Sequence, residues 1–229
     1  AFSHIRLEGV NLTLEQGLDG TPRLRADAGS TETASTLPEV AQWLLAVGRL
    51  EIFGDQLTVL RPDGTALRLL HPWFQVRETG NGQQLAFTTE LPAEQGERLQ
   101  FTVERTVGAA EVWQGRFEFH ADRVNLAGWP LPLPFTAGQA SIHLRGDWQD
   151  WRPVRMAGEI RLQQAALDHR PRFAVLQRWF NQQPDSVLEF SSEAEAGGWQ
   201  WQGQARCNNA QSTFQLRQTG TAWRGHFRD

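Results

Sequence analysis

The stretch Arg98-Leu99-Gln100-Phe101-Thr102-Val103-Glu104 alternates polar and apolar side chains along its whole length. An extended chain places successive side chains on opposite faces of a sheet, so the alternation predicts a strand with one apolar and one polar face. The same period recurs on either side of it, at residues 55–59, 116–120 and 141–145. The chain is therefore expected to be mainly β.

Turn signals separate these alternating runs. Pro62-Asp63-Gly64 and Asn81-Gly82 offer the positive φ angles that tight hairpins need. Gly54-Asp55, Gly146-Asp147 and Gly197-Gly198 are weaker signals of the same kind. Together they predict about a dozen short strands, mostly in an antiparallel meander.

Two segments depart from the β pattern. Residues 36–39 have the spacing of a capping box, with Pro38 in the first turn, and apolar residues follow at helical spacing as far as Gly48. Residues 172–181 place apolar side chains on one helical face, with Pro184 beyond the end. We expect one or two short helices there.

Composition narrows the classes of protein. The 229 residues are 40% hydrophobic and 21% charged, which excludes disorder as the main state. No run of about 18 apolar residues is present, so no transmembrane helix is expected. The balance of 26 acidic against 22 basic residues argues against nucleic acid as a partner.

The beginning of the chain bears on its organisation. It starts without an initiator Met or a signal peptide, so we expect a segment of a larger protein whose anchor lies elsewhere. Residues 1–229 are interpreted as one segment, with a subdivision near 129–135, where the sequence is rich in Pro, as the alternative.

Residues that carry chemistry do not form a known catalytic motif. None of the six His stands at metal-ligand spacing from a second His or Cys. His120 and Asp122 share one strand face, but no third ligand is near in sequence, so both are expected to be isolated surface side chains. Asp147 and Asp150 are interpreted as turn residues, and Cys207 as an inert thiol. We expect no enzymatic activity, no cofactor and no metal.

The ten Trp residues are the unusual feature of the composition. Trp packs in cores and at sheet edges, with its indole N–H donated to a carbonyl, and this is the interpretation favoured here. A platform on which sugars stack and a belt at an apolar boundary are the alternatives.

Three motifs follow one another in the middle of the chain. They are W-x-G at residues 113–115, D-(x)3-L-(x)2-W at 122–129, and a Gly followed by W-(x)2-W between 138 and 151. This order resembles the large AsmA-like envelope proteins, and among them the YhdP-type branch. The segment 42–59, a short helix leading into a strand pair, is similar to the same proteins. The likeness covers roughly residues 37–168.

The resemblance implies both a fold and a function. Proteins of this kind are anchored in the Gram-negative inner membrane, extend across the periplasm, and are built from a long sheet folded into a groove. They are implicated in moving phospholipid between the inner and outer membranes. The resemblance therefore implies an elongated, curved antiparallel sheet, a periplasmic location, and two partners: phospholipid and the remainder of its own chain with the inner-membrane anchor.

A groove needs apolar side chains that the protein does not cover itself. A strand with one apolar face must bury it, against a second sheet in a β-sandwich or against acyl chains in a groove, where burial is favourable by about 0.8 kcal/mol per CH₂. A closed, dry core is the alternative for each residue. The apolar members of the alternating runs are the groove candidates: Leu57, Val59, Phe74, Val76, Leu85, Phe87, Phe101, Val103, Phe117, Phe119, Ile142 and Leu144.

These considerations predict a non-enzymatic phospholipid conduit. Two other functions stay open at this point. One is a β-sandwich module that binds a polysaccharide or a protein partner, and the other is a structural scaffold with an exposed sheet edge.

Overall fold

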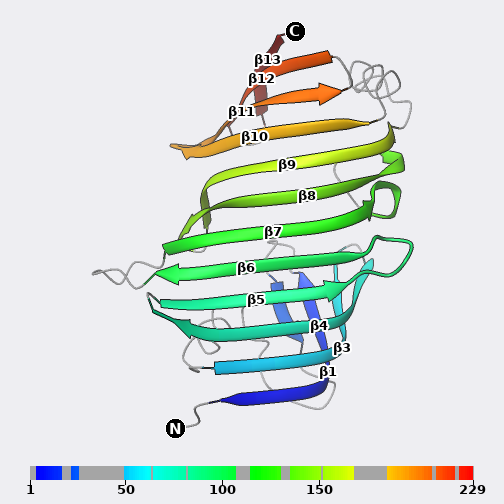
Figure 1. Ribbon diagram of the computed structural model, residues 1–229, viewed down its shortest axis with the longest axis vertical. Coiled ribbons are helices and arrows are strands. Elements are labelled where there is room, and N and C mark those ends of the chain that lie inside the picture. Colours follow the sequence, from blue (N-terminus) through cyan, green and yellow to red (C-terminus); the bar gives the residue numbers. More distant parts are fainter. Residues whose placement is uncertain are drawn as a thin grey trace. The chain divides into compact units, whose positions relative to one another are not determined.

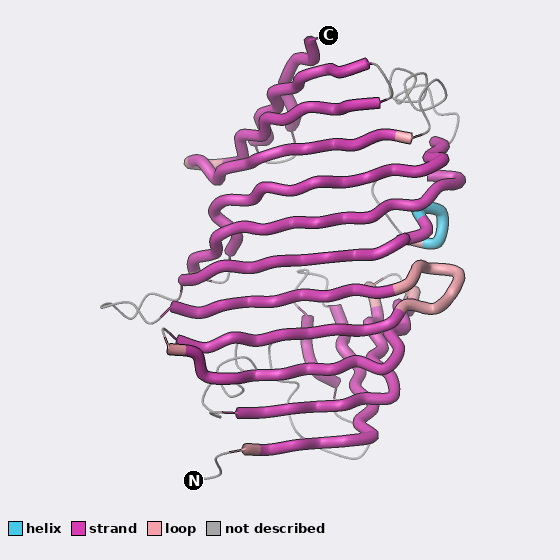
Figure 2. The backbone as a smooth tube through the Cα atoms, viewed as in Figure 1, coloured by secondary structure: helices cyan, strands magenta, loops and turns pink. Residues whose placement is uncertain are grey.

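Strands make up nearly all of the residues that the computed structural model describes (Figures 1 and 2). The prediction of a mainly β chain is thus confirmed. The residues that the structure describes are 4–16, 22–25, 49–62, 64–80, 82–106, 114–129, 135–150, 152–167, 185–207, 210–219 and 222–228. Among them no helix is long and apolar enough to cross a membrane.

The chain divides into two compact units, and the first contains Ala1–Pro92 and Leu99–Trp113. Its sheet has the strand order β6-β5-β4-β3-β1-β2, with β1 parallel to β3 and the pairs β1–β2, β3–β4 and β4–β5 antiparallel. The strands are β1 (Ile5–Gln16), β2 (Pro22–Arg25), β3 (Arg49–Leu60), β4 (Ala66–Thr79), β5 (Gly82–Glu90) and β6 (Arg98–Thr106).

The second unit contains Ala93–Arg98 and Gln114–Asp229. Its strands follow one another in chain order from β7 to β13, and every neighbouring pair is antiparallel, as the turn signals predict. Its elements are β7 (Gln114–Asn125), the 3-10 turn η1 (Leu126–Gly128), β8 (Phe135–Gln149), β9 (Arg152–Leu167), β10 (Ser186–Glu195), β11 (Gly198–Cys207), β12 (Ala210–Thr219) and β13 (Ala222–Arg228).

The long strands bend within their length, as β1 and β9 show in Figure 1. The register shifts by one residue near His71 in β4, near Arg123 in β7 and at Gly138 in β8, opposite Gln164 of β9. All four residues have positive φ angles. An extra residue of this kind is a β-bulge, which bends its strand and increases the twist. The sheets are therefore curved, as expected.

The predicted strands at residues 55–59, 98–104, 116–120 and 141–145 lie in β3, β6, β7 and β8. The turn at residues 62–64 is confirmed by the hydrogen bond from the Gly64 N–H to the Arg61 carbonyl, 3.0 Å. Gly197 lies in the turn between β10 and β11, with a φ of 86°.

Two turn predictions were wrong. Gly54-Asp55 lies inside β3, and Gly146-Asp147 lies inside β8. A Cβ at Gly146 would stand 2.8 Å from the Phe117 ring and in contact with the Arg155 carbonyl, so Gly is required there by close packing and not by a turn. As a result the strands are longer than predicted, up to the 16 residues of β9.

Several predictions fall outside the described residues. The helices expected at 36–48 and 172–181 are among them, as is most of the segment 129–135. The boundary between the units lies at Trp113 and Gln114, so residues 129–135 belong to the second unit.

A small core lies beside η1 in the second unit. Leu126 packs with Ala140, Leu162 and Ala165, and three partly buried residues surround this cluster: Phe135, Ile142 and Ile160. Trp129, which follows η1, donates its indole N–H to the Gln95 carbonyl at 2.8 Å, the satisfied packing role that the sequence favours for Trp.

Candidate functional site

The groove candidates of the first unit gather on one face of its sheet. Val76 lies opposite Leu85 and Leu50, and Phe74 lies opposite Phe87 with ring centroids 4.5 Å apart. Such cross-strand pairs are the units that stabilise a sheet. Four of the predicted residues therefore form one continuous apolar strip on β4 and β5.

A second strip lies beyond the bulge at His71. Leu57 pairs with Leu69 and Val59 with Leu67. The alternation shifts by one residue in both strands before this strip, at His71 in β4 and between Gly54 and Gln56 in β3, so these side chains stay on the apolar face. Burial agrees, because Leu57 and Leu69 are 3% and 5% exposed.

The candidates on β6 follow from a hydrogen bond on the opposite face. Gln84 Nε2 donates to Glu104 Oε1 at 3.1 Å, which places both side chains on the polar face. Val103 precedes Glu104 and Leu85 follows Gln84, so both point to the other side. Phe101, two residues before Val103, shares that side.

In the second unit the four remaining candidates lie on one face of β7 and β8. Phe119 lies opposite Leu144, Phe117 opposite Gly146, and Ile142 opposite Ala121. We call this the apolar face of the second unit. Further along it Phe190 contacts Trp201, with ring centroids 5.5 Å apart.

Glycines allow large side chains to lie flat on this apolar face. A Cβ at Gly158 would stand 2.6 Å from Leu144 Cδ2, and one at Gly203 would stand 2.7 Å from the Phe214 ring. Each large side chain thus covers a neighbouring glycine instead of projecting from the sheet. The apolar surface is therefore continuous, and the large side chains project little from the plane of the sheet.

Exposure separates the candidates into two groups. Leu57 and Val76 are 3% and 1% exposed and belong to a packed core. The other ten are half-buried. Ile142 also packs against the core beside η1, so its part of the face is filled by the protein itself.

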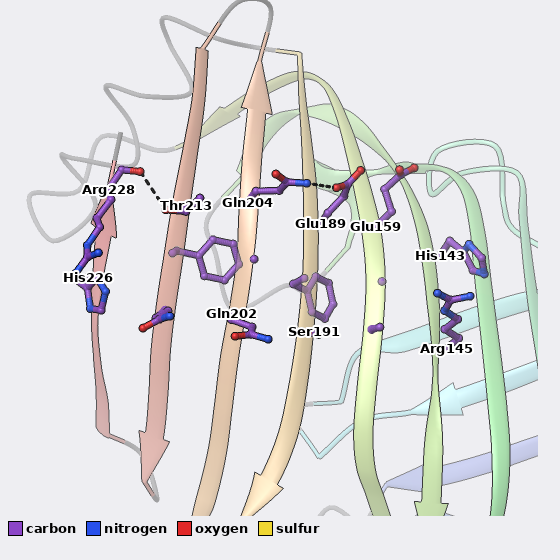
Figure 3. Close-up of a pocket in the computed structure, with 16 residues that line it drawn as sticks. His143, Arg145, Glu159, Glu189, Ser191, Gln202, Gln204, Thr213, His226 and Arg228 are labelled. Atoms are coloured by element: carbon purple, nitrogen blue, oxygen red, sulfur yellow. Dashed lines mark hydrogen bonds between the residues drawn. The ribbon is translucent and has the colours of Figure 1, made fainter.

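A cavity of about 760 Å³ lies among β8 to β13, and none of the twelve candidates lines it. Most of its lining comes from the polar face of the second unit, opposite the apolar face. The register aligns one row of side chains across the strands, seen in Figure 3: His143, Glu159, Glu189, Gln204, Thr213 and Arg228.

Hydrogen bonds hold this row in place. Glu189 accepts hydrogen bonds from Gln204 and Arg206, and Gln211 Nε2 donates to Gln204 Oε1 at 2.9 Å. Arg161 donates to Glu159 at 2.5 Å and holds the pKa of that carboxyl below its ordinary value. The cavity therefore presents amides, hydroxyls and paired charges.

The polar face also carries a cluster that the sequence did not reveal. His143 lies directly opposite His120, and both Nε2 atoms contact Glu118 Oε1, at 2.9 and 3.1 Å. The hydrogen bonds from His143 and His120 hold the pKa of the Glu118 carboxyl below its ordinary value. The prediction that His120 is an isolated side chain was wrong.

The reason for this miss is the distance along the chain. His143 lies 23 positions after His120, and only the β7–β8 register brings the two together. The available signal was the alternation in both strands, which places Glu118, His120 and His143 on polar faces. Alternation alone does not show that His120 and His143 lie opposite each other, because that depends on the register between the two strands.

Comparisons of the chain with protein-family models, with curated proteins and with solved structures find no match.

Proposed function

We propose that the chain is a non-enzymatic segment of a lipid conduit, in which phospholipid acyl chains lie against the apolar faces of its sheets. One observation carries the proposal. Ten of the twelve predicted apolar side chains are half-buried and keep part of their surface exposed on the apolar faces of the two units, and only two are fully buried. Apolar surface left in this state gains free energy when hydrocarbon covers it.

The shape of the apolar face supports a mobile ligand. Leu144 and Phe214 lie flat over glycines, which gives an acyl chain a smooth apolar surface along which it can slide. The seven strands of the second unit span about 29 Å at the usual strand spacing. That is about twice the thickness of one leaflet of hydrocarbon, so a whole acyl chain fits along the face.

The location and partners belong to the same proposal. They rest on the likeness of the motifs at residues 113–151 to the AsmA-like envelope proteins. We accordingly propose a periplasmic segment that works together with the remainder of its chain and an inner-membrane anchor.

Site-specific photocrosslinking tests the proposal on both faces of the sheet. A benzophenone amino acid replaces Phe119 on the apolar face in one variant and exposed Gln202 on the polar face in a matched control. After irradiation with phospholipid vesicles, mass spectrometry is expected to find a lipid adduct at position 119 and none at position 202. Equal labelling at both positions, or none at 119 in a variant with native circular dichroism, would refute the conduit.

The cavity on the polar face favours a second candidate function, the binding of a polysaccharide. Gln202, Gln204 and Thr213 offer the amide and hydroxyl groups that hydrogen-bond to sugar hydroxyls. The same two variants separate the alternatives, because irradiation with oligosaccharides in place of vesicles would then label position 202 and leave position 119 unlabelled.

A further inference from the structure

Glu118, His120 and His143 form a compact set of ligand atoms on the polar face of the second unit. Their nearest ligand atoms all lie within 4.8 Å of one another. Glu118 and His120 are two residues apart on β7, and His143 faces His120 from β8. A paired set of antiparallel strands is a rigid support, which suits a site whose geometry must be held.

The two imidazole rings are arranged to share one partner. They are stacked, with centroids 4.1 Å apart and planes inclined by 18°. Each ring directs the same nitrogen, Nε2, to the same carboxylate oxygen of Glu118. Two neutral imidazoles and one carboxylate around a common point are the ligands that Zn²⁺ accepts.

The distances agree with a tetrahedral ion. Bonds of about 2.0–2.1 Å to nitrogen and oxygen place neighbouring ligand atoms about 3.3 Å apart. The two Nε2 to Oε1 distances are 3.1 and 2.9 Å. Glu118 Oε1 thus stands at about ligand spacing from each nitrogen, and rotation of the stacked rings about their side-chain bonds would direct both Nε2 lone pairs to one ion.

The site is accessible and leaves room for a further ligand. The side chains of Glu118, His120 and His143 are 51%, 39% and 45% exposed. Three protein ligands leave the fourth position of a tetrahedral ion to water or to a bound molecule. His143 also lines the cavity of Figure 3, so an ion held here lies at the margin of that cavity.

Charged side chains flank the cluster on β8 and β9. Arg145 lies opposite Glu118, and Glu159 lies opposite His143 on the other side of β8. Glu159 is engaged by Arg161, so it is a neighbouring negative charge and not a fourth ligand in this arrangement. The cluster is thus flanked by the Arg145 cation and by the Glu159–Arg161 ion pair.

From this geometry we propose that Glu118, His120 and His143 bind a divalent transition-metal ion of the Zn²⁺ type, with one coordination position open. The site clamps β7 to β8 and is independent of the lipid conduit. Hard cations such as Mg²⁺ are not expected to bind, because they prefer oxygen ligands.

Calorimetric titration of the full chain with Zn²⁺ near pH 7.5, where free imidazoles are neutral, tests the proposal. One equivalent is expected to bind, and His143→Asn and His120→Asn are each expected to weaken binding at least about tenfold. Titration with Mg²⁺ is expected to give no binding at the same concentration.

His71→Asn is the matched control. His71 Nδ1 also contacts a glutamate, Glu90 Oε2 at 3.0 Å, but these two side chains belong to no three-residue cluster among the described residues. Asn tolerates the positive φ of residue 71, so this variant is expected to fold and to bind Zn²⁺ unchanged. Circular dichroism verifies the fold of all three variants.

Substitution by Co²⁺ gives an independent readout. A tetrahedral site is expected to give visible absorption bands that the His143→Asn variant lacks. The proposal is overturned if the full chain binds no Zn²⁺ at about 100 μM, or if His143→Asn and His71→Asn change the affinity equally, which would indicate adventitious surface binding.

Discussion

At the scale of single residues, the surroundings of a side chain decide its chemistry. Cys207 is 3% exposed and donates its thiol to the Asp185 carbonyl, while burial raises its pKa. Glu118, in contrast, is exposed and its pKa is lowered by two histidines. The inert thiol inferred from the sequence agrees with the first environment, whereas nothing local in the sequence indicated the second.

Cys207 is expected to react slowly with iodoacetamide in the folded protein. Its thiolate is scarce near neutral pH and its sulfur is covered, so alkylation at about pH 8 is expected to be on the order of 100-fold slower than that of free cysteine. Mass spectrometry over time measures the rate. A Cys207→Ser, Gln211→Cys variant places the thiol at an exposed position and should react at nearly the free rate; fast reaction of native Cys207 would contradict its burial.

At the scale of strands, glycines and bulges shape the sheets. Gly146 lies beneath the Phe117 ring, and Gly138, with a φ of 112°, marks the bulge where β8 bends. Alternation predicts that a strand is present, but it does not distinguish a glycine in a turn from a glycine covered by a neighbouring ring. That ambiguity explains why the turn predicted at Gly146-Asp147 was wrong.

Gly146→Ala is expected to lower the free energy of unfolding by about 1–3 kcal/mol, because its methyl group would collide with the Arg155 carbonyl and the Phe117 ring. Urea denaturation measures the change. Gly80→Ala is the control, since nothing lies within 4 Å of a Cβ there, and it is expected to change stability by less than about 0.5 kcal/mol. Equal effects of the two substitutions would contradict the close packing at Gly146.

At the scale of the whole molecule, each unit contains at least one carboxylate whose pKa is held low by hydrogen bonds. In the first unit Glu51 accepts hydrogen bonds from Arg49 at 3.1 Å and Gln75 at 3.2 Å. In the second unit Glu118 and Glu159 are held by histidine and arginine partners. At pH values just below the ordinary glutamate pKa, these carboxyls therefore bind fewer protons in the folded protein than in the unfolded protein.

Stability is accordingly expected to be lost on acidification. A carboxyl with a lowered pKa in the folded state contributes stability above its unfolded pKa of about 4.3, and the contribution disappears as the pH falls through the folded pKa. Urea midpoints are expected to be constant between about pH 7 and 5 and to fall below that. Glu51→Gln should lower the urea midpoint at neutral pH and make the midpoint fall less steeply below pH 5. A midpoint that falls with pH as steeply as in the native protein would contradict the role given to Glu51.

The sequence by itself determined that the chain is β and which residues share a face, because alternation depends only on the local geometry of an extended chain. Residues 98–104 and 141–145 needed no distant partner to be identified as strands, and Phe119 and Leu144 were found on the apolar side in the same way. The tertiary structure alone decided the register, and with it the bulges, the cavity on the polar face and the meeting of His120 with His143. The register between β7 and β8 joins residues as far apart in the chain as His120 and His143, and no local pattern within either strand contains that information.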